Sequence, residues 1–306
     1  MPHRKIAKDA AGFIRAEQSD QGQGTLLALA NIGRKRESIL RYYVISDPHG
    51  FYTETRDALK KAGFFDDPDP HKLIVCGDLM DRGAEAEKMQ TFMEELLDKE
   101  MLIFVRGNHE DLMQIMLDDI LDDFTPFLGL RSYHVRNGTL DTAAQLNKFT
   151  LGEFLSDPAS FVSKTKESVF YRKLIPSAVN YYETKNYVFV HGWIPCIRSD
   201  HRNVLTRYKY IPVIDWRSAS EEAWKEARWT NGMEAAEFGK ITEDGKTIVC
   251  GHWHASYGHA VVQGKCPEHG DKAIYDTYFG NGVIGLDACT AITRKVNCIV
   301  IEDDPL

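Results

Sequence analysis

Short apolar runs alternate with stretches of helical periodicity from residue 41 onward. The pattern predicts, in order, a strand at 41–46, a helix at 53–63, a strand at 72–76, a helix at 84–98, a strand at 101–105 and a helix at 109–122. Strands that alternate with helices in this way are typical of an α/β fold. Each strand ends in polar, loop-forming residues, and ligands of such sheets gather beyond the carboxyl ends of the strands.

The rest of the chain has fewer clear elements. Its pattern predicts a hairpin at 179–192 with a Lys-Asn turn, a helix at 220–229, a strand at 247–251, and two tail segments, 282–289 and 295–302, that alternate like antiparallel strands. Residues 123–180 are mixed and weakly helical, with the clearest helical pieces at 141–149 and 151–157, and we interpret them and residues 195–246 as insertions in one domain that spans 41–306. Residues 1–40 are expected to form an N-terminal extension outside that domain.

Composition and charge narrow the classes of partner. The 306-residue chain has a net charge of −8, and its largest basic block is RKR at 34–36, so we expect no nucleic-acid partner. The apolar stretch at 25–32 is too short to cross a bilayer, so we expect no membrane partner. The six cysteines form no CxxC pair, and Cys76 and Cys250 lie in apolar runs typical of buried strands. Reduced thiols and a cytoplasmic location are therefore expected.

The predicted strand ends share one kind of chemistry, since each offers a carboxylate, an amide or an imidazole. The candidate metal ligands are Asp47, His49, Asp78, Asn108, His191, His252 and His254. Because no cysteine is among them, the set favours a catalytic site for Mn²⁺, Fe or Zn²⁺ over a structural zinc site. Seven donors exceed what one open catalytic metal takes, so the sequence predicts two divalent ions, with manganese favoured.

Two adjacent ions need a shared anionic ligand, and the carboxylate of Asp78 is the natural candidate. One ion would take Asp47, His49, Asp78 and His254, and the other Asp78, Asn108, His191 and His252. Taken singly, each residue is more simply a turn, a cap or a hydrogen-bonded side chain. Converging carboxylates, however, would repel by about 4 kcal/mol per pair at 4 Å and an effective dielectric near 20. Bound cations remove that repulsion.

The blocks SDPHG, GDLMDRG, RGNHE, VHG and GHWH, in this order between residues 46 and 254, resemble the calcineurin-like metallophosphoesterase superfamily. The DRG and GNHE forms are most similar to the bacterial type of the serine/threonine phosphoprotein phosphatase branch. Symmetrical dinucleoside tetraphosphatases are similar too, but tend to carry ARG and GNHD. The resemblance implies a four-layer α/β/β/α sandwich with two mixed sheets and a dimetal site at the strand ends.

The resemblance also implies roles beside the metals. His109 resembles the family's general acid, which protonates the leaving oxygen, and Asp81 is its expected orienting partner. The DRG context favours contact between Arg82 and the phosphate oxygens. Arg106 either assists in binding the substrate or forms a bracing salt bridge. Trp193 and Trp253, which adjoin ligands, either line the pocket or pack behind the ligands.

The expected activity is a dimetal-dependent phosphoric ester hydrolase in which a metal-bridging hydroxide attacks phosphorus. The first interpretation is a phosphatase for phosphate monoesters, including phosphoserine and phosphothreonine in proteins. The alternative is a hydrolase of dinucleoside polyphosphates or other phosphodiesters. A non-catalytic binding protein is a third possibility, which is disfavoured because a scaffold has no need of a proton donor such as His109 beside the metals. The partner is thus a phosphorylated protein or small molecule.

Overall fold

The computed structural model describes residues 40–128, 132–200 and 208–306. The predicted N-terminal extension, residues 1–40, lies outside the described residues except for Leu40. Within the described residues, none of the helices has the length and apolar character needed to cross a membrane.

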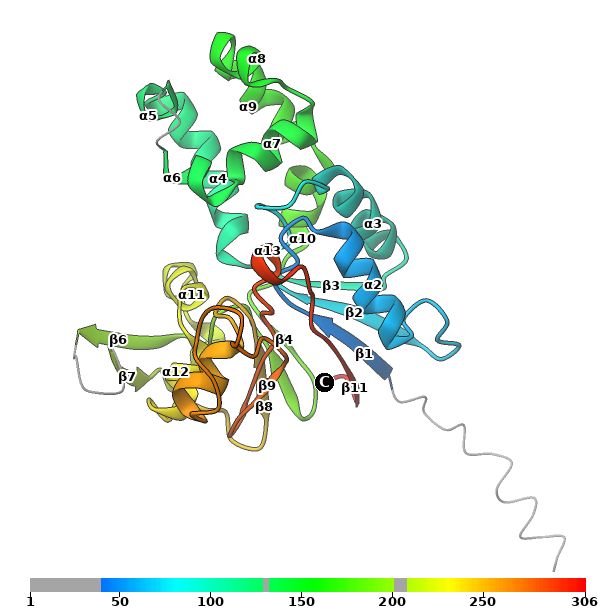
Figure 1. The fold of residues 1–306 in the computed structure, drawn as a ribbon, viewed down its shortest axis with the longest axis vertical. Coiled ribbons are helices and arrows are strands. Elements are labelled where there is room, and N and C mark those ends of the chain that lie inside the picture. The colour runs from blue at the N-terminus through cyan, green and yellow to red at the C-terminus, as the bar shows by residue number, and fades with distance from the viewer. Residues whose placement is uncertain (1–39, 129–131, 201–207) are drawn as a thin grey trace, which may run out of the picture. The chain divides into compact units, whose positions relative to one another are not determined.

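The first sheet contains the strands predicted in the first third of the chain (Figure 1). Its order is β11 (Cys298–Asp303), β1 (Leu40–Ile45), β2 (His71–Cys76) and β3 (Leu102–Val105). β1, β2 and β3 run parallel, with Val44 opposite Ile74 and Ile74 opposite Ile103, and β11 lies antiparallel on the edge. Because the three parallel strands end in the same direction, the loops that follow them meet at one edge.

Three helices connect and follow these strands: α2 (Tyr52–Ala62), α3 (Ala86–Asp98) and α4 (Asn108–Asp122). The strands and helices predicted for residues 41–122 are confirmed, with every end within two residues of the predicted position. α2 ends at Gly63, whose left-handed φ of 93° lets its N–H reach back to the last carbonyls of the helix. The apolar faces of these helices pack in one core with the outer face of the first sheet.

The second sheet has the order β4 (Tyr182–Glu183), β5 (Tyr187–Phe189), β8 (Thr247–Cys250), β10 (Val283–Gly285) and β9 (Tyr278–Phe279). The predicted hairpin at 179–192 and strand at 247–251 are confirmed as β4–β5 and β8. The antiparallel prediction is confirmed for β11 with β1 and for β10 with β9, whereas β10 pairs parallel with β8. β10 is a buried interior strand, and such strands pair in either direction.

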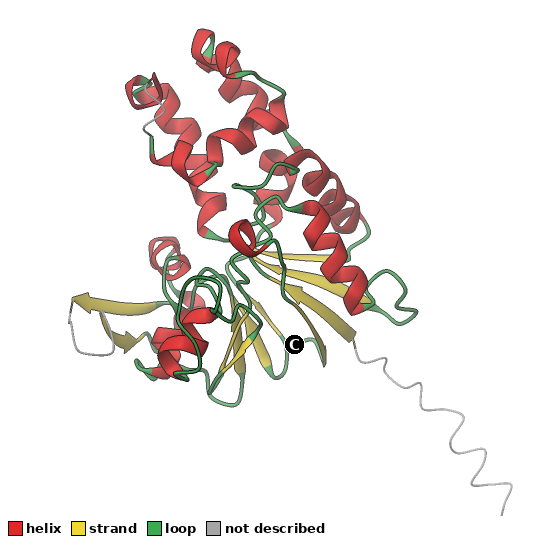
Figure 2. Ribbon diagram, in the orientation of Figure 1, coloured by secondary structure: helices red, strands yellow, loops and turns green. Residues whose placement is uncertain are grey.

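The two sheets face one another across an apolar layer that contains Tyr42, Val44 and Ile74 from the first sheet and Phe189, Val249 and Ile284 from the second. A separate core joins the other face of the second sheet to α11 (Glu221–Arg228) and α12 (Gly232–Glu237). The layers of the fold follow in the order helices, sheet, sheet, helices. Figure 2 shows both strand layers between helical regions. The predicted four-layer α/β/β/α fold with two mixed sheets is confirmed.

The described parts of the two predicted insertions contain helices and strands, including helices at the two weakly helical pieces predicted at 141–149 and 151–157 in the first insertion. Residues 123–180 form short helices: α5 (Thr125–Leu128), α6 (Tyr133–Asn137), α7 (Thr139–Asn147), α8 (Leu151–Ser156), α9 (Pro158–Glu167), the π-helical turn Phe170–Leu174 and α10 (Ile175–Ser177). Residues 195–246 contain the predicted helix α11 and an unpredicted hairpin, β6 (Cys196–Asp200) with β7 (Tyr208–Pro212). Later short helical turns are Trp216–Ser218, Gly258–Val262 and α13 (Thr290–Thr293).

Candidate metal and catalytic site

The loops after β1, β2 and β8 hold several non-glycine residues in the left-handed backbone region. These are Asp47 (φ 52°), His49 (φ 49°), Asp78 (φ 53°), Asp81 (φ 78°), Arg82 (φ 65°) and His252 (φ 64°). Left-handed backbone is unfavourable for residues with a Cβ, and such strain concentrates at functional sites where the surrounding structure holds it in place. The loops where the sequence predicts metal ligands therefore have a strained backbone.

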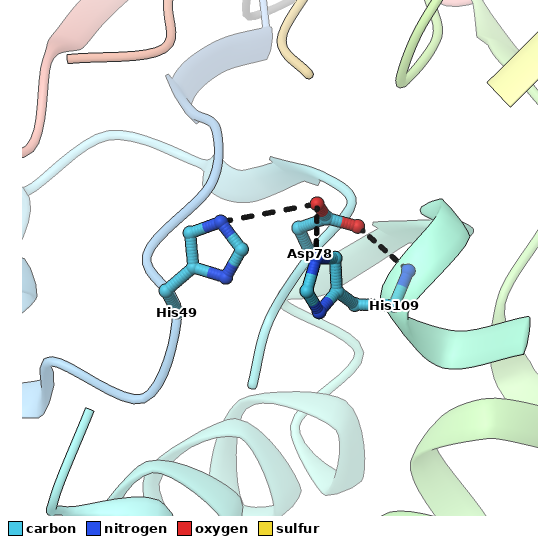
Figure 3. A group of neighbouring side chains, drawn as sticks. All are labelled: His49, Asp78 and His109. Atoms are coloured by element: carbon cyan, nitrogen blue, oxygen red, sulfur yellow. Dashed lines mark hydrogen bonds and ion pairs between the residues drawn. The ribbon is translucent and has the colours of Figure 1, made fainter. Parts of the chain in front are cut away.

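Asp78 lies at the centre of the candidate site. Its Oδ1 is 3.2 Å from Nε2 of His191, and its Oδ2 is 3.9 Å from Nε2 of His49 and 3.8 Å from Nε2 of His109. Figure 3 shows the imidazoles of His49 and His109 on two sides of this carboxylate. Burial opposes ionisation of Asp78, but the imidazoles of His191, His109 and His49 outweigh it and hold its pKa below the usual range.

His191 shows why a cation fits this centre. Its Nδ1 donates to the carbonyl of Cys76 at 2.9 Å, and burial lowers the pKa of the ring, so its Nε2 carries a lone pair. That lone pair faces Oδ1 of Asn108 at 2.8 Å and Oδ1 of Asp78 at 3.2 Å. Three acceptors thus converge without a proton between them, which is unfavourable in a buried site unless a cation binds there.

Asp47 supports the same conclusion from the opposite loop. Both of its carboxylate oxygens accept from the backbone N–H of His252, at 3.1 and 3.0 Å, and the hydroxyl of Ser46 donates to it as well. Burial, followed by the nearby negative charges of Asp287 and Asp78, raises the pKa of Asp47 well above its usual value. A positive charge beside Asp47 would remove that penalty.

His49 is also presented as a neutral ligand. Its Nδ1 donates to the carbonyl of Met80 at 3.0 Å, which leaves the lone pair on Nε2, and burial and the positive charge of Arg82 lower its pKa. His252 is similar, since burial and the neighbouring His191 lower its pKa to about 3. A backbone carbonyl that fixes the tautomer of an imidazole is the usual support of a metal-ligating histidine.

The described residues contain two groups of donor atoms that share Asp78: His49 with Asp78 and His109, and Asp78 with His191 and His252. Within each group the ligand atoms lie within 4.8 Å of one another. The central position of Asp78 and its oxygen and imidazole neighbours are compatible with the predicted dimetal arrangement. Since no thiolate is present, the donor chemistry suits a catalytic divalent ion.

His109 and Asp81 form a close polar pair in the site. Nδ1 of His109 lies 2.6 Å from Oδ2 of Asp81, and that oxygen also accepts from the hydroxyl of Thr139 at 2.7 Å. Burial disfavours the imidazolium, but the carboxylates of Asp78 and Asp81 outweigh it and raise the pKa of His109. The two carboxylates thus favour the protonated form of His109 beside the candidate metal ligands.

The two candidate substrate arginines lie in different surroundings. Arg82 reaches both imidazoles, with Nη1 at 2.9 Å from Nε2 of His49 and Nη2 at 3.2 Å from Nε2 of His109. Arg106 instead pairs with Asp111 at 2.7 Å and contacts the side chain of Gln114. Arg82 therefore lies where a phosphate would meet the ligands, whereas the contacts of Arg106 match the salt-bridge interpretation.

The contacts of His254 are with residues outside the predicted ligand set. Its Nε2 is 3.1 Å from Oε1 of Glu268, and it groups with Glu268 and His269. Asp287, which the sequence interpretation did not single out, is buried near the site, and burial raises its pKa to about 6 although its carboxylate accepts from the N–H of Cys289 at 2.6 Å. The signal for Asp287 was present in the sequence, because an aspartate directly follows the apolar run at 283–286.

Glycines let the loops approach the ligands closely. A Cβ at Gly251 would collide with the side chains of Ser46 and Asp47, and a Cβ at Gly107 would collide with Asp78. Glu110 braces the same region, because its carboxylate accepts from the N–H groups of Gly107 at 2.7 Å, Asp78 at 3.1 Å and Leu79 at 3.0 Å. Glu110 therefore caps helix α4, and it also fixes the backbone of Asp78.

The chain is similar to several characterised proteins. The asymmetrical bis(5'-nucleosyl)-tetraphosphatase PrpE of Halalkalibacterium halodurans is 26% identical over 139 residues, which are 43% of this chain and 52% of that protein. The symmetrical bis(5'-nucleosyl)-tetraphosphatase of Xylella fastidiosa is 26% identical over 251 residues, which are 72% of this chain and 80% of that protein. The match therefore spans about half the length of the first relative.

Among solved structures, the cold-active protein-tyrosine phosphatase of a Shewanella species aligns with a TM-score of 0.44 and 15% identity, over 86% of this chain and 76% of that one. The family described as "Calcineurin-like phosphoesterase" matches residues 40–285. This range includes every candidate ligand loop and both sheets, except for strand β11. On this match, the chain belongs to the calcineurin-like phosphoesterase family.

Proposed function

We propose that this chain hydrolyses dinucleoside polyphosphates with the help of two divalent cations. Two relatives named as bis(5'-nucleosyl)-tetraphosphatases support this substrate class, and one of them aligns over most of both chains. The alternative stated from the sequence is therefore favoured over the phosphoprotein interpretation. The single structural observation that carries the proposal is a pair of exposed indoles beside the candidate metal centre.

The indoles belong to Trp229 and Trp253. Their rings lie 5.6 Å and 6.1 Å from the ring of His252, and they are 39% and 36% exposed, whereas the chain's other three tryptophans are buried. Exposed aromatic faces next to a phosphate-binding centre suit a substrate whose phosphates carry a nucleobase, because bases stack on such faces. A phosphoserine side chain has no ring to use them.

The residues divide the work of hydrolysis between them. We propose Asp47, His49, Asp78, Asn108, His191 and His252 as ligands of the cations, with Asp78 shared by both. When bound, the cations supply Lewis acidity that activates a water nucleophile and neutralises phosphate charge. The guanidinium of Arg82 binds phosphate oxygens, and its position against His49 and His109 puts it within reach of a phosphate there.

His109 is proposed to act as the general acid. Its imidazolium holds a proton on Nδ1 against Asp81 and has Nε2 directed toward Asp78 and Arg82. Proton transfer from this Nε2 to the departing phosphate oxygen would assist a poor leaving group. Asp81 is a positioning residue, because it fixes the tautomer and charge of the ring without touching the substrate.

The proposal is tested with a substrate panel. The purified chain is loaded in parallel with Mn²⁺, Fe²⁺ or Zn²⁺ and assayed on diadenosine tetraphosphate, p-nitrophenyl phosphate, its bis-ester and a phosphoserine peptide. We expect the highest kcat/KM on diadenosine tetraphosphate, and chromatography of the products separates symmetrical cleavage to two ADP from asymmetrical cleavage to ATP and AMP. A higher kcat/KM on the phosphoserine peptide would refute the proposed substrate class and restore the monoesterase interpretation.

A further inference from the structure

His254, Glu268 and His269 form a cluster of metal-ligating side chains that the proposed mechanism does not use. Nε2 of His254 lies 3.1 Å from Oε1 of Glu268, and Nε2 of His269 lies 3.8 Å from the same oxygen. The two imidazole rings are 5.0 Å apart, and one donor atom from each of the three residues lies within 4.8 Å of the others. We propose that these three residues bind one divalent cation of the Zn²⁺ type, at a site separate from the centre around Asp78.

The cluster joins two segments that are distant in sequence. His254 follows strand β8 and stacks on Trp253, with the rings 5.9 Å apart at an angle of 24°. Glu268 and His269 come from the long segment before β9, and this segment is held in place because the hydroxyl of Ser256 donates to the backbone carbonyl of Glu268 at 2.8 Å. The donors are therefore brought together by the fold and not only by proximity along the chain.

The spacing of the donor atoms suits a tetrahedral ion. With metal–ligand distances of about 2.0–2.1 Å, the ligands of tetrahedral zinc lie about 3.3–3.4 Å from one another. The two measured distances to Oε1 of Glu268, 3.1 and 3.8 Å, bracket that value. Two imidazoles and one carboxylate are a ligand set that zinc accepts, and they leave one coordination position open for water or an anionic oxygen.

The cluster is separate from the main centre in the described part of the chain. The groups that share Asp78 contain His49, His109, His191 and His252, but not His254. The side chains of His254 and Glu268 are partly buried, at 17% and 29% exposure, whereas that of His269 is 72% exposed, so the cluster lies at the surface of the protein. The sequence prediction placed His254 in the first ion's ligand set, and the two assignments predict different metal contents for simple variants.

The decisive variants are Glu268→Gln and His269→Ala, because neither residue belongs to the predicted dimetal set. Each purified protein is equilibrated with Zn²⁺ and desalted, and bound metal is measured by mass spectrometry. We expect both variants to retain one equivalent fewer than the unchanged chain. His259→Ala is the matched control, since His259 lies nearby in sequence but bonds to Gln263 and Asp276, and it should retain the full amount.

Cobalt substitution and a double variant sharpen the test. Co²⁺ in the proposed site should give the intense visible absorption of tetrahedral coordination, and Glu268→Gln should remove that component. His254→Ala and the double variant His254→Ala with Glu268→Gln should lose the same single equivalent, because the residues act on one ion. Far-ultraviolet circular dichroism confirms that each variant is folded.

Equal metal content in the unchanged chain, Glu268→Gln and His269→Ala would overturn the proposal. If either folded variant lost more than one equivalent of metal, the site would not be separate from the centre around Asp78. Both outcomes are independent of the substrate panel. The metal analysis therefore tests the cation site separately from the proposed dinucleoside polyphosphate hydrolysis.

Discussion

The contact between Asp81 and His109 makes a quantitative prediction about pH dependence. Asp81→Asn removes the carboxylate that lies 2.6 Å from Nδ1 of His109 and helps raise the pKa of that imidazole. A hydrogen bond to a charged group contributes about 1.5–3 kcal/mol. At about 1.4 kcal/mol per pKa unit, the pKa of His109 should fall by about one to two units.

The sign of the effect on activity follows from the acid role. The protonated imidazole is the active form of a general acid, and it is lost as the pH rises through the pKa of His109. In Asp81→Asn this loss occurs at lower pH, so the alkaline limb of kcat for diadenosine tetraphosphate should move down by about one to two pH units. On p-nitrophenyl phosphate, whose leaving group needs no proton, the variant should keep most of its kcat.

The matched control for this experiment is Thr139→Val, which removes the other side-chain contact to the same oxygen of Asp81. Because the carboxylate remains beside His109, the alkaline limb of this variant should move by much less than that of Asp81→Asn. An unchanged alkaline limb in Asp81→Asn, or equal losses of kcat on both substrates, would show that His109 does not deliver a proton under the influence of Asp81.

Three further predictions concern metal binding and stability. Asp78→Asn should lose at least about 100-fold in metal affinity, more than the loss of a supporting residue costs, as measured by chelator competition. Gly251→Ala should lower the free energy of unfolding by about 1–3 kcal/mol in denaturant titrations, because its methyl group would meet the side chain of Asp47. Arg106→Ala should lower the free energy of unfolding by about 1–3 kcal/mol, because Asp111 loses one of its partners. KM for diadenosine tetraphosphate should stay unchanged, and a large rise in KM would restore the substrate role of Arg106.

The candidate ligands at the strand ends were predictable because the local sequence determines where the strands end. Apolar runs ending in polar residues specify parallel strands, and the carboxyl ends of such strands meet at one edge. This is why Asp78, His49 and His191 were placed together from sequence; in the structure Nε2 of His49 and Nε2 of His191 lie 3.9 Å and 3.2 Å from the two different oxygens of the Asp78 carboxylate. The tautomers of the histidines were not predictable, since they depend on the carbonyls of Met80 and Cys76, which come from another strand's loop.

The position of His254 could not be predicted from its spacing. It follows His252 by two residues, which in an extended strand would place both side chains on one face. His252, however, has a left-handed φ of 64°, so the chain turns there and the alternation no longer holds. The partner Glu268 lies in a segment without periodicity, where sequence gives no indication of which residues will meet.

The proposed catalytic residues and the proposed recognition residues lie in different kinds of segment in this chain. The proposed ligands around Asp78 follow strands whose cores are fully buried, so their geometry is held by both sheets. Trp229, Trp253 and Glu268 instead lie in connecting segments and are partly exposed. Substitutions at these three positions can change which substrate or cation is bound while the buried strands and the phosphoester chemistry remain intact. We therefore expect relatives with the same strand-end ligands to differ in specificity through these loops.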